Sequence, residues 1–156
     1  MKVSPKTALL SVSDKKGLVP FARFLESQKI KLIATGGTEK ILKEAGIKVS
    51  SVSSLTGFPE IFGGRVKSIH PNILGGILGQ RDKDEKEAQQ NKVVWIDMVV
   101  CNLYPFQAVA RDPKSTLSEK IENIDIGGPT MIRAAAKNNK WVTVVINPKD
   151  YQGVQS

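Results

Sequence analysis

The sequence predicts an α/β fold, a three-layer sandwich around a mainly parallel sheet of about five strands. Three observations support this prediction: short apolar runs recur along the chain, helical periodicities separate them, and glycines or polar residues follow most of the runs. Apolar strands that alternate with helices are typical of a parallel sheet covered on both faces and joined by right-handed crossovers. A chain of 156 residues is long enough for one core, so we expect a single domain over residues 1–156.

Five apolar runs are expected to form the strands. Each is short, rich in β-branched or aliphatic residues, and bounded by glycine, proline or polar residues. In chain order they are TALLSVS (7–13), KLIATGG (31–37), KVSSVS (48–53), WIDMVVCNLYPF (95–106) and WVTVVINP (141–148).

Helices are expected between these strands. Leu18, Ala22 and Leu25 recur at helical spacing after the first run. Pro71 and Pro129 suit the first turns of two later helices. The other predicted helices are TEKILKEAG (38–46), HPNILGGILG (70–79), TLSEKIENI (116–124) and GGPTMIRAAAKNN (127–139). The polar segment 83–92 is either an exposed helix or mobile, and residues 152–156 are expected to form a tail.

Composition narrows the classes of function. No apolar run approaches the ~20 residues of a bilayer span, and the first residues lack a secretory signal, so we expect a cytoplasmic protein without membrane contact. The net charge of +8 is compatible with nucleic-acid binding. Most lysines, however, alternate with acidic residues and no aromatic residues are interleaved, so we expect no nucleic-acid partner. The single cysteine, Cys101, lies in an apolar run and is expected to be buried and not nucleophilic.

Polar residues follow each predicted strand. Because the carboxyl ends of parallel strands meet at one edge of a sheet, we expect these residues to gather on one rim. Their hydroxyls, amides and ammonium groups suit a phosphate. The rim residues are Ser11, Ser13, Asp14 and Lys15, then Thr35, Gly36, Gly37 and Thr38, then Arg65 to Ser68, then Asn102 and Tyr104, and finally Asn147 to Asp150.

Two glycine-rich motifs on this rim have two interpretations each. In TGGT (35–38) the backbone amides approach an anion and Thr38 caps the next helix, or the motif is an ordinary strand-to-helix turn. In GGRVKSIHPNILGG (63–76) Arg65 and Lys67 project to one side of an extended segment toward a ligand, or they are exposed loop cations. The glycine pairs favour a close approach of the backbone to a ligand, and His70 is expected to be a loop or capping histidine.

The motif IDIGGPT (124–130) also leaves two possibilities open. Asp125 either caps the helix that follows, or its carboxylate accepts a proton or orients a lysine while the next amides form an oxyanion hole. Lys137 lies twelve residues further along the same helix, at ~1.5 Å per residue, and reaches Asp125 only by folding back or from a second subunit. Neither a P-loop nor a dinucleotide motif is present. One histidine and one cysteine cannot form an ordinary zinc site. Metal-free acid–base chemistry on an anionic substrate remains.

Five motifs together resemble the N-terminal domain of the bifunctional purine-biosynthesis enzymes that combine formyltransferase and inosine monophosphate cyclohydrolase activities. They are SVSDKKGLVPFA, ATGGT, LTGFPEIFGGRVKSIHP, CNLYPF and IDIGGPTMIRAAAKN. The resemblance implies a methylglyoxal-synthase-like fold and a homodimer. It implies closure of 5-formamidoimidazole-4-carboxamide ribotide to inosine monophosphate with loss of water, without a metal or redox cofactor. Only a C-terminal formyltransferase domain would use 10-formyltetrahydrofolate.

The same resemblance implies roles for individual residues. The catalytic group it implies is Lys67, Tyr104, Asp125 and Lys137, and the role of Lys137 depends on the resemblance alone. The rim and the resemblance together give the expected substrate-binding residues. They are Ser11, Ser13, Asp14, Lys15, Thr35, Gly36, Gly37, Thr38, Arg65, Val66, Ser68, Cys101, Asn102, Ile126 and Gly127. Cys101, Asn102, Asp125 and Ile126 are the ones expected near the base, and no metal ligand is expected.

The chain departs from the family pattern at three positions. Leu74 replaces a histidine, and Gly79 and Gln80 replace an Ala-Arg pair that is frequent in the family. The chain is also shorter than the usual cyclohydrolase domain, so it is either a piece of a bifunctional enzyme or a stand-alone protein. Two other functions remain open: a non-catalytic nucleotide- or phosphate-sensing domain of the same fold, and a basic nucleic-acid-binding domain.

Overall fold

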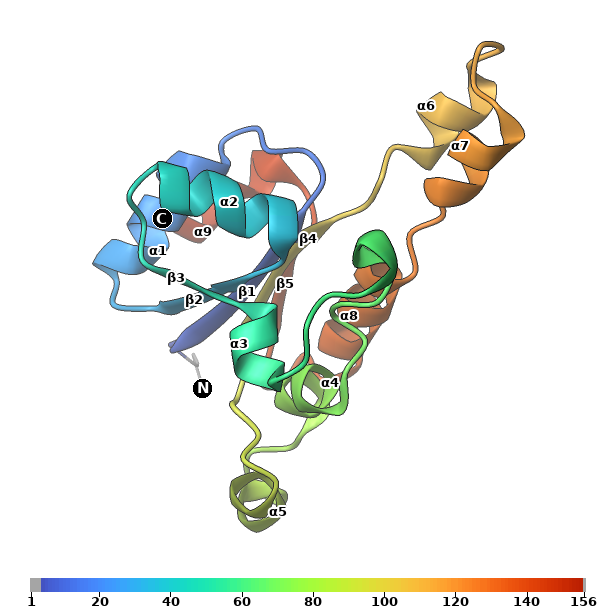
Figure 1. Ribbon diagram of the computed structural model, residues 1–156. Helices are drawn as coiled ribbons and strands as arrows, with labels where there is room; N and C mark the ends of the chain where they lie inside the picture. Colours follow the sequence, from blue (N-terminus) through green and yellow to red (C-terminus); the bar gives the residue numbers. More distant parts are fainter. Residues whose placement is uncertain (1–3, 156) are drawn as a thin grey trace.

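The computed structural model describes residues 4–155 and contains a parallel sheet with helices on both faces (Figure 1). The strand order is β3-β2-β1-β4-β5, and every neighbouring pair is parallel. Leu9 in the central strand pairs with Ile33 on one side and with Val99 on the other. The strands are β1 (Thr7–Val12), β2 (Lys31–Ala34), β3 (Val49–Ser51), β4 (Met98–Asn102) and β5 (Thr143–Val145). The predicted five-stranded α/β sheet is therefore confirmed.

The helices fill the connections between strands. They are α1 (Leu18–Ser27), α2 (Gly36–Glu44), α3 (Val52–Thr56), α4 (Pro71–Leu78), α5 (Glu85–Gln90), α6 (Phe106–Arg111), α7 (Leu117–Glu122), α8 (Gly127–Lys137) and α9 (Tyr151–Gln155), with two 3₁₀ turns, η1 (Phe62–Gly64) and η2 (Pro148–Asp150). Within residues 4–155, no helix is long and apolar enough to cross a membrane.

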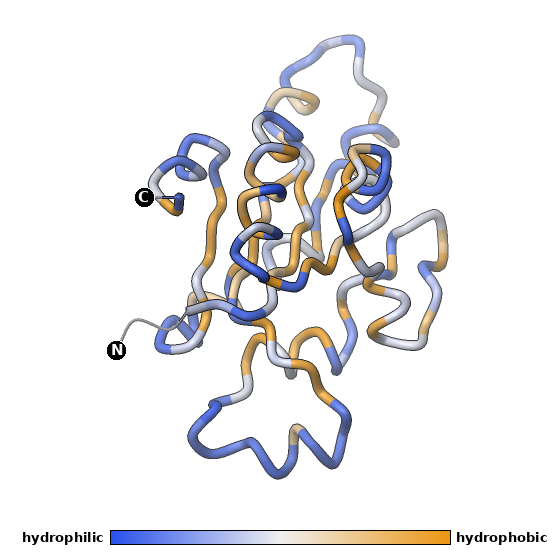
Figure 2. Tube along the Cα trace, turned by 90° about the vertical axis from the view of Figure 1, so that its left-hand side faces the viewer, coloured by the Kyte–Doolittle hydropathy of each residue, from blue (hydrophilic) through white to orange (hydrophobic). Residues whose placement is uncertain are grey.

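Alternate residues of the strands supply two separate cores. On one face Ala8 and Leu10 pack with Phe21 of α1 and Leu42 of α2. On the other face Leu9 packs with side chains of α3, α4 and α8. Because strand side chains point alternately to opposite faces, this pattern requires helices on both sides of the sheet. Figure 2 shows hydrophobic colour along the inner part of the trace and hydrophilic colour along the segment that contains α5.

Several predicted boundaries of strands and of the C-terminal tail are wrong. The third predicted strand ends early because the Ser51 hydroxyl accepts a hydrogen bond from the Ser54 amide at 3.0 Å and starts α3. The fourth begins only at Met98 and ends at Asn102. The predicted tail, residues 152–156, lies in α9 as far as Gln155. This short helix is held by the ring of Tyr151, which stacks on Phe21 with centroids 4.2 Å apart.

Helices α6 and α7 project from the body of the domain, away from the sheet (Figure 1). They follow β4 directly, and α8 returns the chain to the sheet. The end of α7 and the segment after it therefore lie near the carboxyl ends of the central strands. Helix α5 lies at the opposite end of the molecule.

Candidate active site

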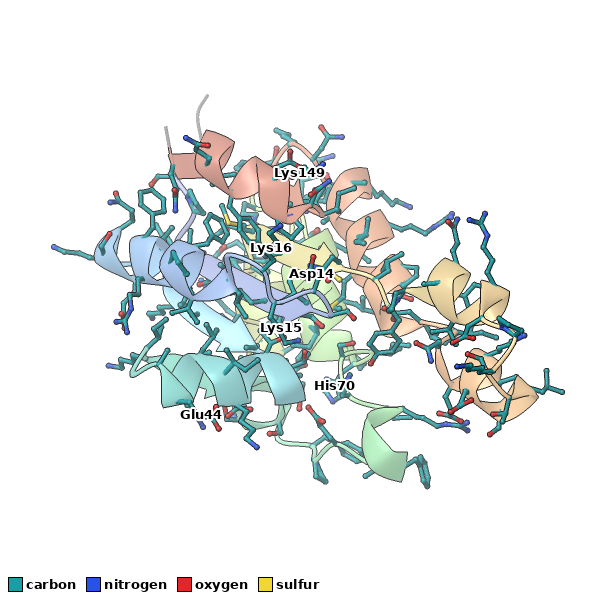
Figure 3. All side chains as sticks on the ribbon, turned by 90° about the horizontal axis from the view of Figure 1, so that it is seen from above. Asp14, Lys15, Lys16, Glu44, His70 and Lys149 are labelled. Atoms are coloured by element: carbon teal, nitrogen blue, oxygen red, sulfur yellow. The ribbon has the colours of Figure 1, made fainter. Side chains whose placement is uncertain are left out.

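A cavity of about 600 Å³ lies at the carboxyl ends of β1, β2 and β4. Its walls come from four of the five rim segments that the sequence predicts, and from the end of α7. Figure 3 views this end of the sheet from above, with Lys15 near the middle and Glu44 at the outer end of α2. The predicted site residues that line the cavity are Ser11, Ser13, Lys15, Thr35, Gly37, Thr38, Arg65, Lys67, Ser68, Asn102, Tyr104, Asp125, Ile126 and Gly127.

Other predicted residues lie outside this lining. They are Asp14, Gly36, Val66, Cys101 and Lys137, together with the whole segment Asn147 to Asp150. The last segment follows β5, which is parallel to β4, so it lies at the predicted edge of the sheet but does not line the cavity. In that segment the Asn147 side chain accepts a hydrogen bond from the Lys149 amide at 3.0 Å and caps the short turn η2. The side-chain oxygen of Asn147 is therefore used within the segment.

Lys15 and Lys67 contribute positive charge to the cavity, beside Arg65, which pairs with Glu122. Burial lowers the pKa of Lys15, and the nearby charge of Lys67 lowers it further. The Lys15 ammonium donates hydrogen bonds to the carbonyl oxygens of Val12 and Ser13, at the end of β1. Two ammonium groups that repel each other in one hollow favour an anion between them.

The hydroxyls beside these lysines are already hydrogen bonded within the protein. The Ser11 and Thr35 hydroxyls lie 2.9 Å apart and share a hydrogen bond. The interpretation in which Thr38 caps α2 is wrong. The buried Thr38 hydroxyl accepts from the Val12 amide at 3.1 Å and so holds α2 against the end of β1, while Thr35 is the N-cap residue. The hydroxyls position the wall of the cavity.

The TGGT turn exposes one amide to the cavity and covers the other. The Gly36 amide donates a hydrogen bond at 3.1 Å to the carboxylate of Glu60, a residue outside the predicted site. The Gly37 amide has no hydrogen-bond partner among residues 4–155. An anion at the start of α2 therefore finds the Gly37 amide open, as expected for a helix N-terminus, and the Gly36 amide occupied.

Asn102 positions the loop that carries Lys15. Its side-chain oxygen accepts hydrogen bonds from the amides of Ser13 and Asp14 at 2.7 and 2.8 Å, and its side-chain nitrogen donates to the Asp14 carbonyl oxygen at 3.0 Å. The polar atoms of Asn102 are thus engaged by backbone. Its implied contact with a base stays a prediction.

Asp125, which precedes the N-cap residue Ile126, caps the start of α8 with its side chain, and this is one of the two interpretations of IDIGGPT. Its carboxylate accepts a hydrogen bond from the Gly128 amide at 2.8 Å, so that amide is not available to an oxyanion. The Gly127 amide has no hydrogen-bond partner in the described part of the chain. Cys101 is buried with its sulfur 3.9 Å from the Gly128 carbonyl oxygen, and burial, aided by the Asp125 charge, raises its pKa to about 12.

Lys137 and His70 both lie apart from the cavity lining. Lys137 is the last residue of α8, whose first residue, Gly127, lines the cavity, and its side chain is exposed. Eleven residues of helix separate the two ends by ~15 Å. His70 is the N-cap of α4, where its ring nitrogen Nδ1 accepts from the Asn72 amide at 3.1 Å. The prediction of a capping histidine is confirmed.

The three departures from the family pattern also lie outside the cavity. Leu74 packs against the core of the α4 and α8 face. Gly79 lies under the ring of Trp95, which occupies the space that a Cβ would need. The backbone amide of Gln80 is held by Asp84 at 2.7 Å. These positions therefore affect packing around α4.

The cavity wall also contains residues outside the predicted site. Glu122 lines it at the end of α7 beside Arg65, whereas Glu60, also outside the predicted site, accepts from the Gly36 amide without lining the cavity. Ile121 and Ile124 add apolar surface from the same side. Glu122 precedes the IDIGGPT motif by only two residues, which is the one signal that marks it for attention.

Comparisons with known proteins give one matching family, similar relatives and a similar solved structure. The MGS-like domain family matches residues 17–130. The bifunctional purine biosynthesis proteins PurH of Halalkalibacterium halodurans and Bacillus cereus are each 54% identical over 151 residues, which is 96% of this chain and 30% of theirs. This chain thus spans less than a third of the length of these relatives. The solved structure described as the crystal structure of ForH superimposes with a TM-score of 0.81 at 35% identity, covering 96% of this chain and 76% of that one.

Proposed function

The chain belongs to the MGS-like domain family, and from this premise we propose that it is an inosine monophosphate cyclohydrolase of purine biosynthesis. The reaction is the ring closure of 5-formamidoimidazole-4-carboxamide ribotide with loss of water. One observation carries the proposal: Lys15, Lys67, Tyr104 and Asp125, from four distant segments, line a single cavity of about 600 Å³. A volume in this range is typical of small-molecule sites.

The ring closure is intramolecular, so the first task of the site is orientation. The carboxamide nitrogen attacks the formyl carbon of the same molecule, and well-oriented attack of this kind gains at most ~7 to 11 kcal/mol. One carboxamide proton moves to the former formyl oxygen. The resulting hydroxyl then leaves as water, with the proton of the formamide nitrogen.

The cavity residues suit these steps. Lys15 and the open Gly37 amide would hold the phosphate, and Lys67 would stabilise the oxygen that becomes negative during attack. Tyr104 and Asp125 would orient the carboxamide. Lys137 would act as the proton shuttle only from a second copy of the chain, because its own helix carries it away from the cavity.

We also propose the surroundings in which this site works. The protein would act in the cytoplasm as a homodimer, with a purine nucleotide as ligand and without metal, membrane or nucleic-acid partner. The formyltransferase activity that uses 10-formyltetrahydrofolate would belong to a further domain of a longer protein. Sedimentation of the chain with and without inosine monophosphate tests the dimer.

Ultraviolet absorbance tests the reaction, because ring closure changes the chromophore. Addition of the formylated ribotide to the chain should produce inosine monophosphate, and a Lys67→Ala variant should lose about 10²- to 10³-fold in kcat. Lys86→Ala, which removes one exposed lysine on the distant helix α5, is the matched control. A wild-type chain that leaves the ribotide unchanged overturns the proposed activity.

A non-catalytic nucleotide-sensing domain is the second candidate. The position of Lys137 outside the cavity favours it, since one member of the implied catalytic group is missing from the chain's own site. This function predicts tight binding of a purine nucleoside monophosphate without turnover. Calorimetric titration with inosine monophosphate, run beside the absorbance assay, separates the two functions. In the absorbance assay, a normal rate for the Lys137→Ala variant would exclude Lys137 as the proton shuttle.

A further inference from the structure

Arg65 and Glu122 form a bidentate ion pair in the lining of the cavity. The Arg65 Nε donates to one carboxylate oxygen of Glu122 at 3.2 Å, and its Nη2 donates to the other. The residues are 57 positions apart, one beside the turn η1 and the other at the end of α7. The pair thus connects the glycine-rich loop with the projecting helices, and both residues line the cavity.

The backbone that carries Arg65 is held independently of this pair. The Ile61 amide donates to the Val66 carbonyl oxygen at 3.1 Å, which closes the loop around η1. On the other side of the loop, Glu60 is tied to the Gly36 amide at 3.1 Å. The long Arg65 side chain is therefore the part of the loop that still needs to be oriented, and Glu122 orients it.

The pair uses only one edge of the guanidinium group. An arginine has five N–H donors in a planar fork, and the Nη1 donors of Arg65 have no hydrogen-bond partner within residues 4–155, so they can meet a second oxyanion. The hydrogen bond from Arg65 lowers the pKa of Glu122, so the carboxylate is ionised at neutral pH. The arrangement presents a preoriented cation at the cavity.

Stability is a weak explanation for this pair. The side chains are 64% and 52% exposed, and exposed ion pairs contribute only ~0 to 1 kcal/mol to folding. Recognition of a ligand explains the pair better. An arginine that is already held in place loses less side-chain freedom when it binds an anion.

We propose that Glu122 is a positioning residue for ligand binding: it holds the Nε edge of Arg65 so that the free edge meets an anionic group of the bound nucleotide. The inference depends on the proposed function for the identity of that nucleotide. The opposite role is competition, in which Glu122 occupies Arg65 until the ligand displaces it. The two roles predict opposite signs when Glu122 is replaced.

Calorimetric titration of the complete chain with inosine monophosphate, and separately with inorganic phosphate, measures the sign. Glu122→Ala should bind inosine monophosphate about three- to tenfold more weakly, the range expected for ordering one long side chain. Glu122→Gln should lose less, because its amide oxygen still accepts one hydrogen bond. Glu87→Gln on α5 is the charge-matched control and should bind like the wild type. The denaturant midpoint should hardly change in any variant.

The Arg65→Ala background tests whether Glu122 acts through Arg65. There the Glu122→Ala replacement should cause no further loss of affinity, giving a clear coupling in the double-mutant cycle. The Nε–H proton of Arg65 adds a readout without ligand, because its nuclear magnetic resonance signal should be protected from exchange in the wild type and lost in Glu122→Ala.

Each other outcome overturns the inference. Tighter or unchanged binding by Glu122→Ala contradicts a positioning role, and an equal loss in the Arg65→Ala background shows that Glu122 acts by another route. If the wild type binds inosine monophosphate and only the Glu122 effect is absent, the proposed function survives without this inference. If the wild type binds neither inosine monophosphate nor phosphate, both are rejected.

Discussion

The carbonyl oxygen of Val94 occupies the space that a Cβ atom on Gly76 would need. Backbone therefore meets backbone between α4 and the segment before β4, and the Ile96 amide donates to the Gly76 carbonyl oxygen at 3.0 Å. The adjacent Gly75 differs, since a Cβ there would lie 3.6 Å from the Val93 methyl groups, an ordinary contact. The expected approach of this glycine pair to a ligand is wrong, because Gly76 approaches another part of the chain.

Alanine should have opposite effects at these neighbouring glycines. Gly76→Ala should lower the free energy of unfolding by about 1 to 3 kcal/mol, because the backbone contact leaves no room for a methyl group. Gly75→Ala should raise it by about 0.5 to 1 kcal/mol, because alanine is the better helix former. Urea denaturation of both variants measures the difference, and equal effects would contradict this assignment.

Removal of the Asn102 side chain should loosen the loop that carries Lys15. Asn102→Ala breaks three hydrogen bonds to Ser13 and Asp14, so the free energy of unfolding should fall by about 1 to 3 kcal/mol. Binding of inosine monophosphate should weaken as well. Asn91→Ala, which removes one exposed hydrogen bond at the end of α5, is the control and should leave binding unchanged. Denaturation and calorimetry give the two values.

The lowered pKa of Lys15 predicts two effects of pH. A lysine with a lower pKa in the folded chain binds fewer protons there than when unfolded, so its contribution makes the unfolding free energy rise with pH, between the lowered pKa and the ordinary value of 10.5. The affinity for an anion should fall as the pH increases through the pKa of folded Lys15, because the ammonium charge is lost. Lys67→Gln removes one cause and should move the pKa of Lys15 upward. Carbon-detected magnetic resonance of the Lys15 side chain follows the titration, and an unchanged pKa in Lys67→Gln would reject the coupling.

The Cys101 thiol should be nearly inert in the folded chain. Its pKa of about 12, against an ordinary 9.0, lowers the thiolate fraction near neutral pH by about a thousandfold, and burial also blocks access. Alkylation by iodoacetamide should therefore be slower by at least about that factor than in the urea-unfolded chain. Comparable rates in both states would show that the thiol is accessible.

Much of the fold was predictable because it depends on local pattern and connectivity. Apolar runs and helical spacing predict the five strands and most helices, and parallel connectivity then brings the ends of β1, β2 and β4 together. For this reason Lys15, Thr38 and Asn102 could be expected in one hollow before any contact was known, whereas Asp125 was expected there from the resemblance to the family. The limits of short elements were harder. Helix α9 has few apolar residues of its own and depends on the stacking of Tyr151 on Phe21.

The sequence by itself determined the sheet, its layers of helices and the identity of the segments at its rim. Hydrophobic periodicity and the order of elements along the chain are local properties of the sequence. Only the tertiary structure decided which polar group each side chain meets. Glu60 takes the Gly36 amide and Glu122 takes one edge of Arg65, through contacts between segments 24 and 57 positions apart. Lys137 is carried away from the cavity by the length of α8. Such pairings depend on distances in space, which a one-dimensional pattern does not contain.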